Sequence, residues 1–303
     1  MKQDYDIIII GAGPAGLSAA IYAARYKLNV VIISKDLGGY IATAHKVCNY
    51  PSYPEISGAE LIQRFVKHVE SLGVKIIYEE VIKMENNNKT FTISTIQNSY
   101  SSKKVIFAGG TTKVNLNIPG EKKFLGRGVS YCTTCDAAFF KNKTVAVIGG
   151  SDSALTSALL LANYASKVYI IYRKEKFQKA EPHWIHLLKQ EKKIESIFNE
   201  EVISIIGDKK VESIKLKSGK IMKVDGIFIE AGFVPDINYI SALKINMDEN
   251  GYIITNKDQK TNVKGLYAAG DITDSTLKQV VTAAAQGAIA ANSVYKELEE
   301  ERK

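Results

Sequence analysis

The stretch from Asp6 to Ile33, DIIIIGAGPAGLSAAIYAARYKLNVVII, decides the fold of this chain. Its unbroken apolar run, Asp6–Ile10, is typical of a strand that is buried on both faces of a parallel sheet. The glycine-rich turn GAGPAG follows at Gly11–Gly16, then a stretch of helical composition at Leu17–Arg25 and a second apolar run at Leu28–Ile33. The sequence therefore predicts two parallel strands joined by a turn and a helix.

The same pattern returns in the second half of the chain. A strand is expected at Thr144–Ile148, a glycine loop GGSDSA at Gly149–Ala154, a helix at Leu155–Tyr164 and a strand at Val168–Tyr172. Two such units far apart in the chain indicate two nucleotide-binding-type modules, and not a short-period solenoid.

Outside these units the sequence predicts mostly strands. Runs of strand composition lie at Phe91–Thr95, Val105–Ala108, Lys209–Lys217 and Met222–Glu230, and a further one, Gly265–Asp271, ends in Gly-Asp. The triplet Asn86–Asn88 predicts a turn. We expect a last helix over Val280–Glu297 and a frayed tail at Glu299–Lys303.

Composition narrows the class of protein. A chain of 303 residues suggests two domains, and 46% hydrophobic with 24% charged residues excludes disorder and collagen-like repeats. The net charge of +8 suggests nucleic acid, an anionic cofactor or an acidic protein as partner. The lysines are scattered and form no basic stripe with interleaved aromatics, so a nucleic-acid-binding module is discarded.

Neither a membrane segment nor a targeting segment is predicted. No apolar run reaches the ~18–20 residues of a spanning helix. Met1–Asp6 carries two acids and one lysine, which fits neither a signal peptide nor a transit peptide. We expect a cytoplasmic protein, where thiols are normally reduced.

The first glycine loop predicts a dinucleotide site. Gly11 allows the tight turn, Gly13 lets the backbone approach a pyrophosphate, and Gly16 lets the helix pack on the strand. The helix N-terminus then presents its amide dipoles to the phosphates. The acid expected at the end of the second strand is absent, because Ser34 and Lys35 stand there and Asp36 lies just beyond them. Ribose binding at that position is therefore left open. The alternative is an ordinary tight turn.

The three cysteines indicate redox chemistry more than metal binding. Cys132 and Cys135 have CxxC spacing, which allows an intramolecular disulfide and a thiolate for exchange. Asp136 follows them and can move protons during exchange. A zinc site needs two more soft ligands, and only Cys48, near His45, is available. We interpret Cys48 as a small packing residue.

Several motifs, in this order, resemble the low-molecular-weight bacterial thioredoxin reductases over essentially the whole chain. They are GAGPAG at 11–16, FAGG at 107–110, GVSYCTTCD at 128–136, GGSDSA at 149–154, GDITD at 270–274 and KQVVTAA at 278–284. The first, second and fifth together resemble the three-part FAD signature of two-domain flavoprotein disulfide reductases.

The resemblance implies an α/β protein with two Rossmann-like, three-layer ββα domains, the second inserted in the first. The FAD-binding domain would comprise 1–113 with 243–303, and a pyridine-nucleotide-like domain, 114–242, would carry the CxxC. It also implies a homodimer in which one domain rotates against the other, so that the dithiol faces first the flavin and then thioredoxin.

The resemblance also implies roles for single residues. Cys132 would attack the thioredoxin disulfide, Cys135 would lie nearest the flavin, and Asp136 would be the acid/base; no metal is implied. The residues implied for FAD binding are Gly11, Gly13, Pro14, Ala15, Gly16, Ser34, Gly38, Gly39, Asn49, Val81, Ala108, Gly109, Gly270, Asp271, Lys278, Gln279 and Val280.

The chain departs from the family at the nucleotide site of the second module. Ser151 replaces the glycine that meets the pyrophosphate, and Thr156–Ser157 replace paired glutamates. Tyr172–Lys174 and Gln178 replace the His-Arg-Arg and the further Arg that grip the 2′-phosphate of NADPH, and Arg to Lys loses bidentate contact. Tyr40 replaces a glutamine. A subgroup of the family that accepts electrons from reduced ferredoxin lacks these motifs, and we favour that interpretation.

Alternatives stay open. Arg173, Lys174, Lys176 and Lys179 keep the second module cationic, so a conventional NADPH enzyme with a degenerate grip is the second hypothesis. A non-catalytic flavin-binding sensor is the hypothesis from a different class. Trp184 is either a docking aromatic or a packed one.

Overall fold

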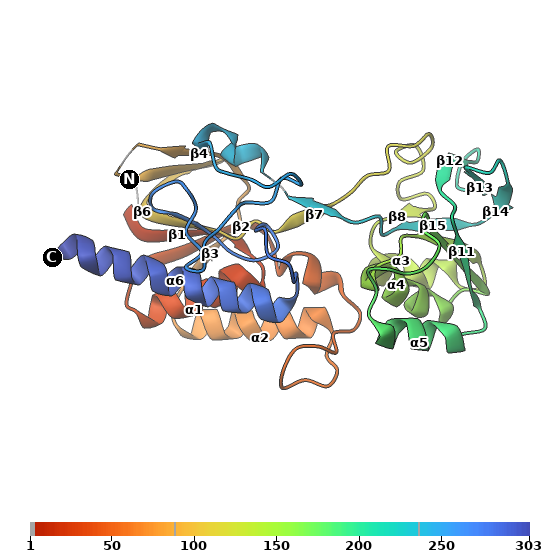
Figure 1. Ribbon diagram of the computed structural model, residues 1–303, viewed down its shortest axis with the longest axis horizontal. Coiled ribbons are helices and arrows are strands. Elements are labelled where there is room, and N and C mark those ends of the chain that lie inside the picture. Colours follow the sequence, from red (N-terminus) through yellow and green to blue (C-terminus); the bar gives the residue numbers. More distant parts are fainter. Residues whose placement is uncertain (1–3, 88, 236) are drawn as a thin grey trace. The chain divides into compact units, whose positions relative to one another are not determined.

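The chain folds into two compact units in the computed structural model, which describes residues 4–87, 89–235 and 237–303. The outer unit consists of Met1–Thr112 and Val234–Lys303, and the inserted unit of Lys113–Phe233 (Figure 1). Each unit is built around its own sheet, so each is described by itself.

A mostly parallel sheet forms the outer unit, in the order β3-β2-β1-β6-β5-β4. The first half of β6 pairs antiparallel with β5, and its last residues pair parallel with β17. The strands are β1 (Asp4–Ala12), β2 (Val30–Leu37), β3 (Lys75–Ile77), β4 (Val81–Asn86), β5 (Phe91–Thr95), β6 (Ser99–Phe107) and β17 (Leu266–Ala268).

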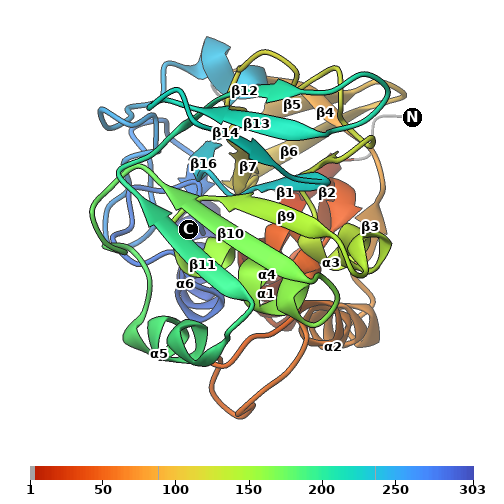
Figure 2. The same ribbon diagram turned by 90° about the vertical axis from the view of Figure 1, so that its right-hand side faces the viewer.

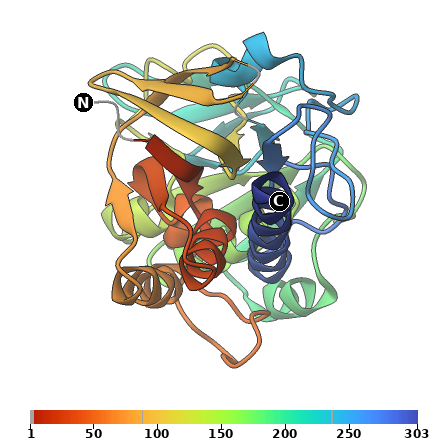
Figure 3. The ribbon, with the colours of Figure 1, turned by 90° about the vertical axis from the view of Figure 1, so that its left-hand side faces the viewer.

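Helices cover one face of this sheet, as Figure 3 shows. They are α1 (Pro14–Arg25), α2 (Gly58–Ser71) and α6 (Val280–Arg302). Small side chains let α1 and α6 pack closely, since a Cβ on Gly287 would lie 2.0 Å from the carbonyl oxygen of Ala15. The other face carries a second apolar cluster with Ile8, Phe107 and Ile240, covered by the β4–β5 meander and the 3-10 helix η3 (Asn238–Leu243). A further 3-10 turn, η1, spans Gly39–Thr43.

The inserted unit repeats this plan on a smaller scale (Figure 2). Its parallel sheet has the order β11-β10-β9-β15-β8, and a three-stranded antiparallel sheet, β12-β13-β14, shares a core with it. Its strands are β8 (Val129–Ser130), β9 (Thr144–Ile148), β10 (Lys167–Tyr172), β11 (Ile194–Phe198), β12 (Val202–Ile206), β13 (Ser213–Leu216), β14 (Ile221–Lys223) and β15 (Gly226–Ile229). Its helices are α3 (Thr133–Asp136), η2 (Ala137–Phe140), α4 (Asp152–Ala162) and α5 (Pro182–Gln190).

Two short strands connect the units. The chain enters the inserted unit through β7 (Thr111–Lys113) and returns through β16 (Phe233–Pro235), and these strands pair with each other. Beside them, the N–H of Val114 donates to the carbonyl of Gly232 at 3.0 Å.

The predicted fold class is confirmed: two Rossmann-like parallel sheets, each with an antiparallel layer and helices. The strands at Phe91–Thr95 and Thr144–Ile148 have the predicted bounds. Within the described ranges, no helix is long and apolar enough to cross a membrane.

The predicted frayed tail is wrong. Helix α6 continues to Arg302, because Lys104 on β6 donates to Glu297 and Glu301 at 2.6 Å each. That ammonium is buried, so the last turns of the helix are tied to the sheet.

Three strand predictions also need correction. The run Met222–Glu230 forms two strands, β14 and β15, which are separated where Asp225 accepts the N–H of Thr144 at 3.0 Å. Of Lys209–Lys217 only the end is a strand, and β12 was not predicted. Strand β2 extends to Leu37, so Ser34–Asp36 lie inside it and not after it. The predicted asparagine turn includes Asn88, which lies outside the described residues.

Candidate functional site

The first glycine loop leaves an open space at the N-terminus of α1. A Cβ on Gly11, at φ +103°, would lie 2.3 Å from the Ala108 carbonyl oxygen, and one on Gly16 would lie 1.9 Å from that of Gly11. On Gly13, by contrast, the nearest atom to a Cβ is the Gly38 carbonyl oxygen at 3.9 Å. Packing therefore requires two of these glycines, while the third keeps room for a ligand before Pro14, the first residue of α1.

Segments from β2 and β6 lie beside this loop. Ser34 accepts the N–H of Ala12 at 3.1 Å, and the N–H of Gly38 donates to the Ala12 carbonyl at 2.8 Å. Ala108 donates its N–H to Ile10 at 2.8 Å, and Gly109 follows it. Gly39 also lies near the loop, since a Cβ added to Gly39 would lie 3.9 Å from the Cα of Gly13.

The segment after β17 reaches the same loop. A Cβ on Gly270 would lie 2.9 Å from that of Ala15, so the backbone there passes directly over the start of α1. Burial raises the pKa of the next residue, Asp271, although the Lys278 charge opposes the shift. Lys278 donates to the carbonyl of Asp271 at 3.1 Å and to that of Thr273 at 2.5 Å.

The start of α6 carries further residues that were predicted to bind FAD. Gln279 caps this helix, accepts a hydrogen bond from Asn49 at 3.2 Å, and precedes the buried Val280. Of the residues predicted to bind FAD, Val81 stands apart, because its side chain is buried in the apolar cluster of the other face of the sheet.

These residues fit a dinucleotide such as FAD. The open space at Gly13 and the uncapped N-terminus of α1 suit a pyrophosphate. A buried carboxyl, Asp271, lies on the segment that crosses the loop and can accept hydrogen bonds from hydroxyl groups of the ligand.

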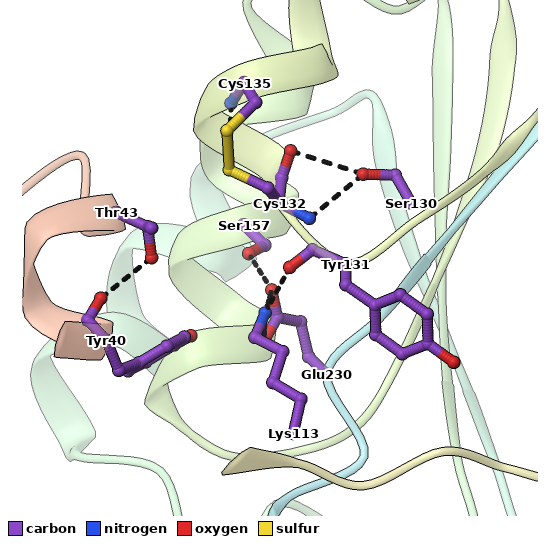
Figure 4. Close-up of a disulfide and its surroundings, with 9 residues drawn as sticks. All are labelled: Tyr40, Thr43, Lys113, Ser130, Tyr131, Cys132, Cys135, Ser157 and Glu230. Atoms are coloured by element: carbon purple, nitrogen blue, oxygen red, sulfur yellow. Dashed lines mark hydrogen bonds and ion pairs between the residues drawn. A yellow bond between two sulfur atoms is a disulfide. The ribbon is translucent and has the colours of Figure 1, made fainter. Parts of the chain in front are cut away.

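The inserted unit carries the disulfide Cys132–Cys135, with the two Cα atoms 5.3 Å apart (Figure 4). Cys132 caps the short helix α3, and its sulfur accepts the N–H of Cys135 at 3.3 Å. Cys135 is exposed, Cys132 is half-buried, and Asp136 ends the helix half-buried.

A buried polar network lies next to this loop and is not apparent from the sequence. Lys113 pairs with Glu230 at 2.9 Å and donates to the Tyr131 carbonyl at 2.6 Å, and Ser157 donates to Glu230 at 3.1 Å. Tyr131 donates its hydroxyl proton to Glu121, and burial together with this bond raises its pKa. The one sequence signal was an acid, Glu230, directly after the apolar run of β15.

Other parts of the inserted unit pack closely against the second glycine loop. A Cβ on Gly149 would lie 2.2 Å from the Glu230 carbonyl oxygen, and one on Gly150 would lie 2.5 Å from the ring of Tyr172. Ser151 is the N-cap residue of α4, but its side chain makes no capping hydrogen bond and instead shares a 3.0 Å hydrogen bond with the hydroxyl of Ser153.

A returning segment covers the start of α4. Lys179 forms a β-bridge with Ser151, and the N–H of Glu181 donates to the carboxylate of Asp152 at 2.7 Å. Burial raises the pKa of Asp152. A protein carboxyl group therefore lies at the helix N-terminus where a phosphate would bind.

Aromatic rings occupy the end of β10. Tyr172 stacks on Phe177 with ring centroids 5.9 Å apart, and Phe177 meets Phe198 edge-on at 5.0 Å. The cationic side chains of this segment, Arg173, Lys174, Lys176 and Lys179, are exposed.

Two further candidates have ordinary surroundings. Trp184 is only 7% exposed and meets His183 edge-on, so it is a packed aromatic and not a docking one. Cys48 is half-buried and is not part of a disulfide. Across the described part of the chain, no group of three His, Cys, Asp or Glu side chains is placed to hold a metal ion.

Comparison with known proteins places this geometry in a family. The model of the pyridine nucleotide-disulphide oxidoreductases matches residues 5–287. The chain is similar to the thioredoxin reductase of Listeria innocua, at 38% identity over 306 residues that span 99% of this chain and 95% of the relative.

Solved structures give the same result. The chain is similar to the thioredoxin reductase of Lactococcus lactis in its FR conformation, with a TM-score of 0.94, 37% identity and coverage of 98% of this chain and 99% of that one. It is also similar to a ferredoxin-flavin thioredoxin reductase from Clostridium acetobutylicum, with a TM-score of 0.56, 34% identity and coverage of 99% and 100%. This chain therefore belongs to the low-molecular-weight thioredoxin reductase family and is a flavin-dependent disulfide oxidoreductase with FAD as its cofactor.

Proposed function

We propose that this protein reduces thioredoxin with electrons that it takes from reduced ferredoxin, and not from NADPH. The observation that carries the choice of donor is the second glycine loop, where Ser151 stands before α4, Asp152 lies in the first turn of that helix and the Tyr172 ring packs on Gly150. A carboxylate at a helix N-terminus repels a phosphate that would bind there.

The outer unit is the FAD-binding domain and the inserted unit is the pyridine-nucleotide-like domain in this proposal. Gly13 and the start of α1 hold the pyrophosphate, and Gln279 and Val280 lie at the flavin ring. Asp271 accepts hydrogen bonds from hydroxyl groups of the FAD. When bound, FAD supplies two-electron chemistry that can reduce a disulfide.

The residues of α3 carry the exchange with thioredoxin. The Cys132 thiolate attacks one sulfur of the thioredoxin disulfide, forms a mixed disulfide and releases the second thioredoxin sulfur as a thiolate. Cys135 then attacks the Cys132 sulfur, which restores the Cys132–Cys135 disulfide and frees the reduced thioredoxin. Asp136 takes the proton from the Cys135 thiol and passes it to the departing sulfur.

Surface properties support protein partners. The net charge of +8 favours encounter with acidic proteins such as ferredoxins and thioredoxins. Phe139, four residues after Cys135, is 80% exposed and offers an apolar contact beside the disulfide. We further propose a homodimer that works in the cytoplasm, where a CxxC pair can be kept reducible.

Anaerobic titration of the purified yellow protein tests the donor. Reduced ferredoxin should bleach the flavin absorbance in stoichiometric amounts, and NADPH or NADH should not. Rapid stoichiometric bleaching by NADPH would overturn the ferredoxin proposal and leave the disulfide chemistry intact.

A conventional NADPH enzyme is the second candidate, because Arg173, Lys174 and Lys179 are exposed and cationic beside the loop. It predicts bleaching by NADPH with a high KM. A non-catalytic flavin sensor is the third. For it, Cys132→Ser would leave the biological role intact, whereas a reductase loses thioredoxin reduction.

A further inference from the structure

A buried ion pair holds the loop that precedes the redox disulfide. The Lys113 ammonium donates to both carboxylate oxygens of Glu230 at 2.9 Å and to the Tyr131 carbonyl at 2.6 Å (Figure 4). The side chain of Lys113 is 17% exposed and that of Glu230 is 3% exposed. Buried charges demand good mutual geometry, so removing either partner leaves the other uncompensated.

The Tyr131 carbonyl belongs to the peptide bond that leads into Cys132. On the other side of that bond, the N–H of Cys132 donates to the Ser130 hydroxyl at 3.0 Å. The same hydroxyl donates to the Cys132 carbonyl at 3.3 Å. Both peptide groups that flank Cys132 are therefore held before α3 begins.

The pair also joins both ends of the inserted unit to this loop. Lys113 is the last residue of β7, through which the chain enters the unit. Glu230 directly follows β15, three residues before the chain leaves through β16. The Lys113 ammonium, which belongs to the entry strand, thus contacts both the exit segment at Glu230 and the redox loop at Tyr131.

We propose that Lys113 and Glu230 are positioning residues that set the reactivity of Cys132. Lys113 holds the Tyr131 carbonyl and favours the Cys132 thiolate, and Glu230 limits that effect by neutralising the ammonium charge. This inference rests on the proposed function only in taking Cys132–Cys135 as the working pair, and it is independent of the electron donor.

The two substitutions therefore act in opposite directions. Lys113→Met removes the cation that faces the Glu230 carboxylate, which disfavours the thiolate and makes the disulfide harder to reduce. Glu230→Gln removes the anion that faces the Lys113 ammonium, which stabilises the reduced pair. The other ionisable groups around the loop, Glu121 and Asp136, are the same in every variant. A purely structural role would move both variants in the same direction.

The experiment equilibrates the FAD-loaded protein in buffers of reduced and oxidised dithiothreitol. Alkylation by iodoacetamide then gives the reduced fraction of Cys132 and Cys135, and the alkylation rate is measured against pH. For reduction of the disulfide, Lys113→Met should lower the equilibrium constant about tenfold and Glu230→Gln should raise it about tenfold, or about 30 mV each way.

Two controls separate charge from stability. Lys113→Arg keeps the cation and should stay near the parent value. Lys217→Met removes an exposed ion pair of the same unit, whose 3.8 Å partner is Glu201, and should change nothing. If Lys113→Met does not fold, Lys113→Gln keeps a donor for the Tyr131 carbonyl without the charge and should shift the equilibrium in the same direction.

Shifts of the same sign in both charge variants would overturn the proposal. Unchanged equilibrium constants and pH profiles with only a lower Tm would overturn it as well. Because no NADPH or ferredoxin enters this measurement, its failure is distinct from a failure of the proposed donor.

Discussion

The two glycine loops of this protein begin alike and end differently. Each follows a buried strand and starts a helix, and each needs its first glycine, since a Cβ on Gly11 or Gly149 would lie 2.3 or 2.2 Å from a carbonyl oxygen. At the next ligand-facing position the outer loop has Gly13 with open space, whereas the inserted loop has Ser151. The strand, turn and helix are therefore alike in both units. In the second unit, contacts within the protein replace the room that the first unit keeps for a ligand.

The largest expected effect is at Gly13. A Cβ added there would have the Gly38 carbonyl oxygen as its nearest neighbour, at 3.9 Å, so Gly13→Val should fold and yet fill the space of the pyrophosphate. Overpacking of about 1–3 kcal/mol corresponds to roughly 10- to 100-fold weaker FAD binding, read from flavin retention after gel filtration.

Gly11→Val is the matched control for that variant. It collides with Ala108 and should lower the yield of folded protein whether or not FAD is added. If Gly13→Val binds as much FAD as the parent protein, Gly13 does not keep room for the pyrophosphate, and the proposed difference between the two loops is wrong.

Acid should next weaken the attachment of the C-terminal turns of α6 to the sheet of the outer unit. Burial opposes ionisation of Glu297, but hydrogen bonds from Lys104, Tyr267 and Lys260 outweigh it and hold the pKa of Glu297 at about 2, below its ordinary 4.5. A depressed pKa contributes stability that is complete above about pH 4.5 and is lost as the pH falls toward 2. The contribution is on the order of 3 kcal/mol.

Glu297→Gln should remove that pH dependence. Urea unfolding followed by flavin fluorescence at pH 6 and pH 4 measures the difference between the variant and the parent chain. Glu299→Gln, which loses only an exposed pair with Arg302, is the control. Equal slopes with pH in all three proteins would contradict the assignment.

Reopening the second loop should have a smaller effect. Ser151→Gly combined with Lys174→Arg and Gln178→Arg restores a glycine and two guanidinium groups, which bind phosphates in bidentate fashion. We expect NADPH to bleach the flavin roughly tenfold faster. A factor of ten corresponds to about 1.4 kcal/mol, which one well-made phosphate contact can supply.

Ser153→Gly in place of Ser151→Gly is the control for the triple variant. It removes the hydroxyl partner of Ser151 without clearing the loop. The same gain with either glycine would mean that Ser151 is not the obstacle, and the difference between the loops would have to lie in the Tyr172 ring.

The smallest effect is that of salt. If the cationic surface of the inserted unit receives an acidic donor, raising the ionic strength from ~0.01 to ~0.15 M shortens the Debye length from about 30 to about 8 Å and slows encounter a few-fold. Stopped-flow reduction by ferredoxin measures this. A rate that does not change with ionic strength would show that the net charge of +8 does not speed the encounter with ferredoxin.

Local signals made much of the fold predictable. Glycines at fixed offsets and apolar runs at Asp6–Ile10 and Thr144–Ile148 specify strand, turn and helix without reference to the rest of the chain. The CxxC pair was equally local, and Cys132 and Cys135 are joined as that spacing allows.

What the sequence did not predict depends on distant residues. The last turns of α6 are fixed by Lys104, nearly two hundred positions earlier, and Lys113 meets Glu230 only after a whole sheet has formed. Strand β12 was missed because Ile203 and Ile206 are exposed while Val202 and Ile205 are buried, a pattern broken by a bulge opposite β13.

The paired strands β7 and β16 make the protein easy to cut and rejoin. Neighbouring strands lie ~4.8 Å apart, so the outer unit's two ends at Thr112 and Val234 are within reach of a short turn. A chain in which a glycine-containing turn replaces Lys113–Phe233 should keep its sheet register and bind flavin as a small carrier. The inserted unit therefore occupies the place of a loop between Thr112 and Val234 of the outer unit.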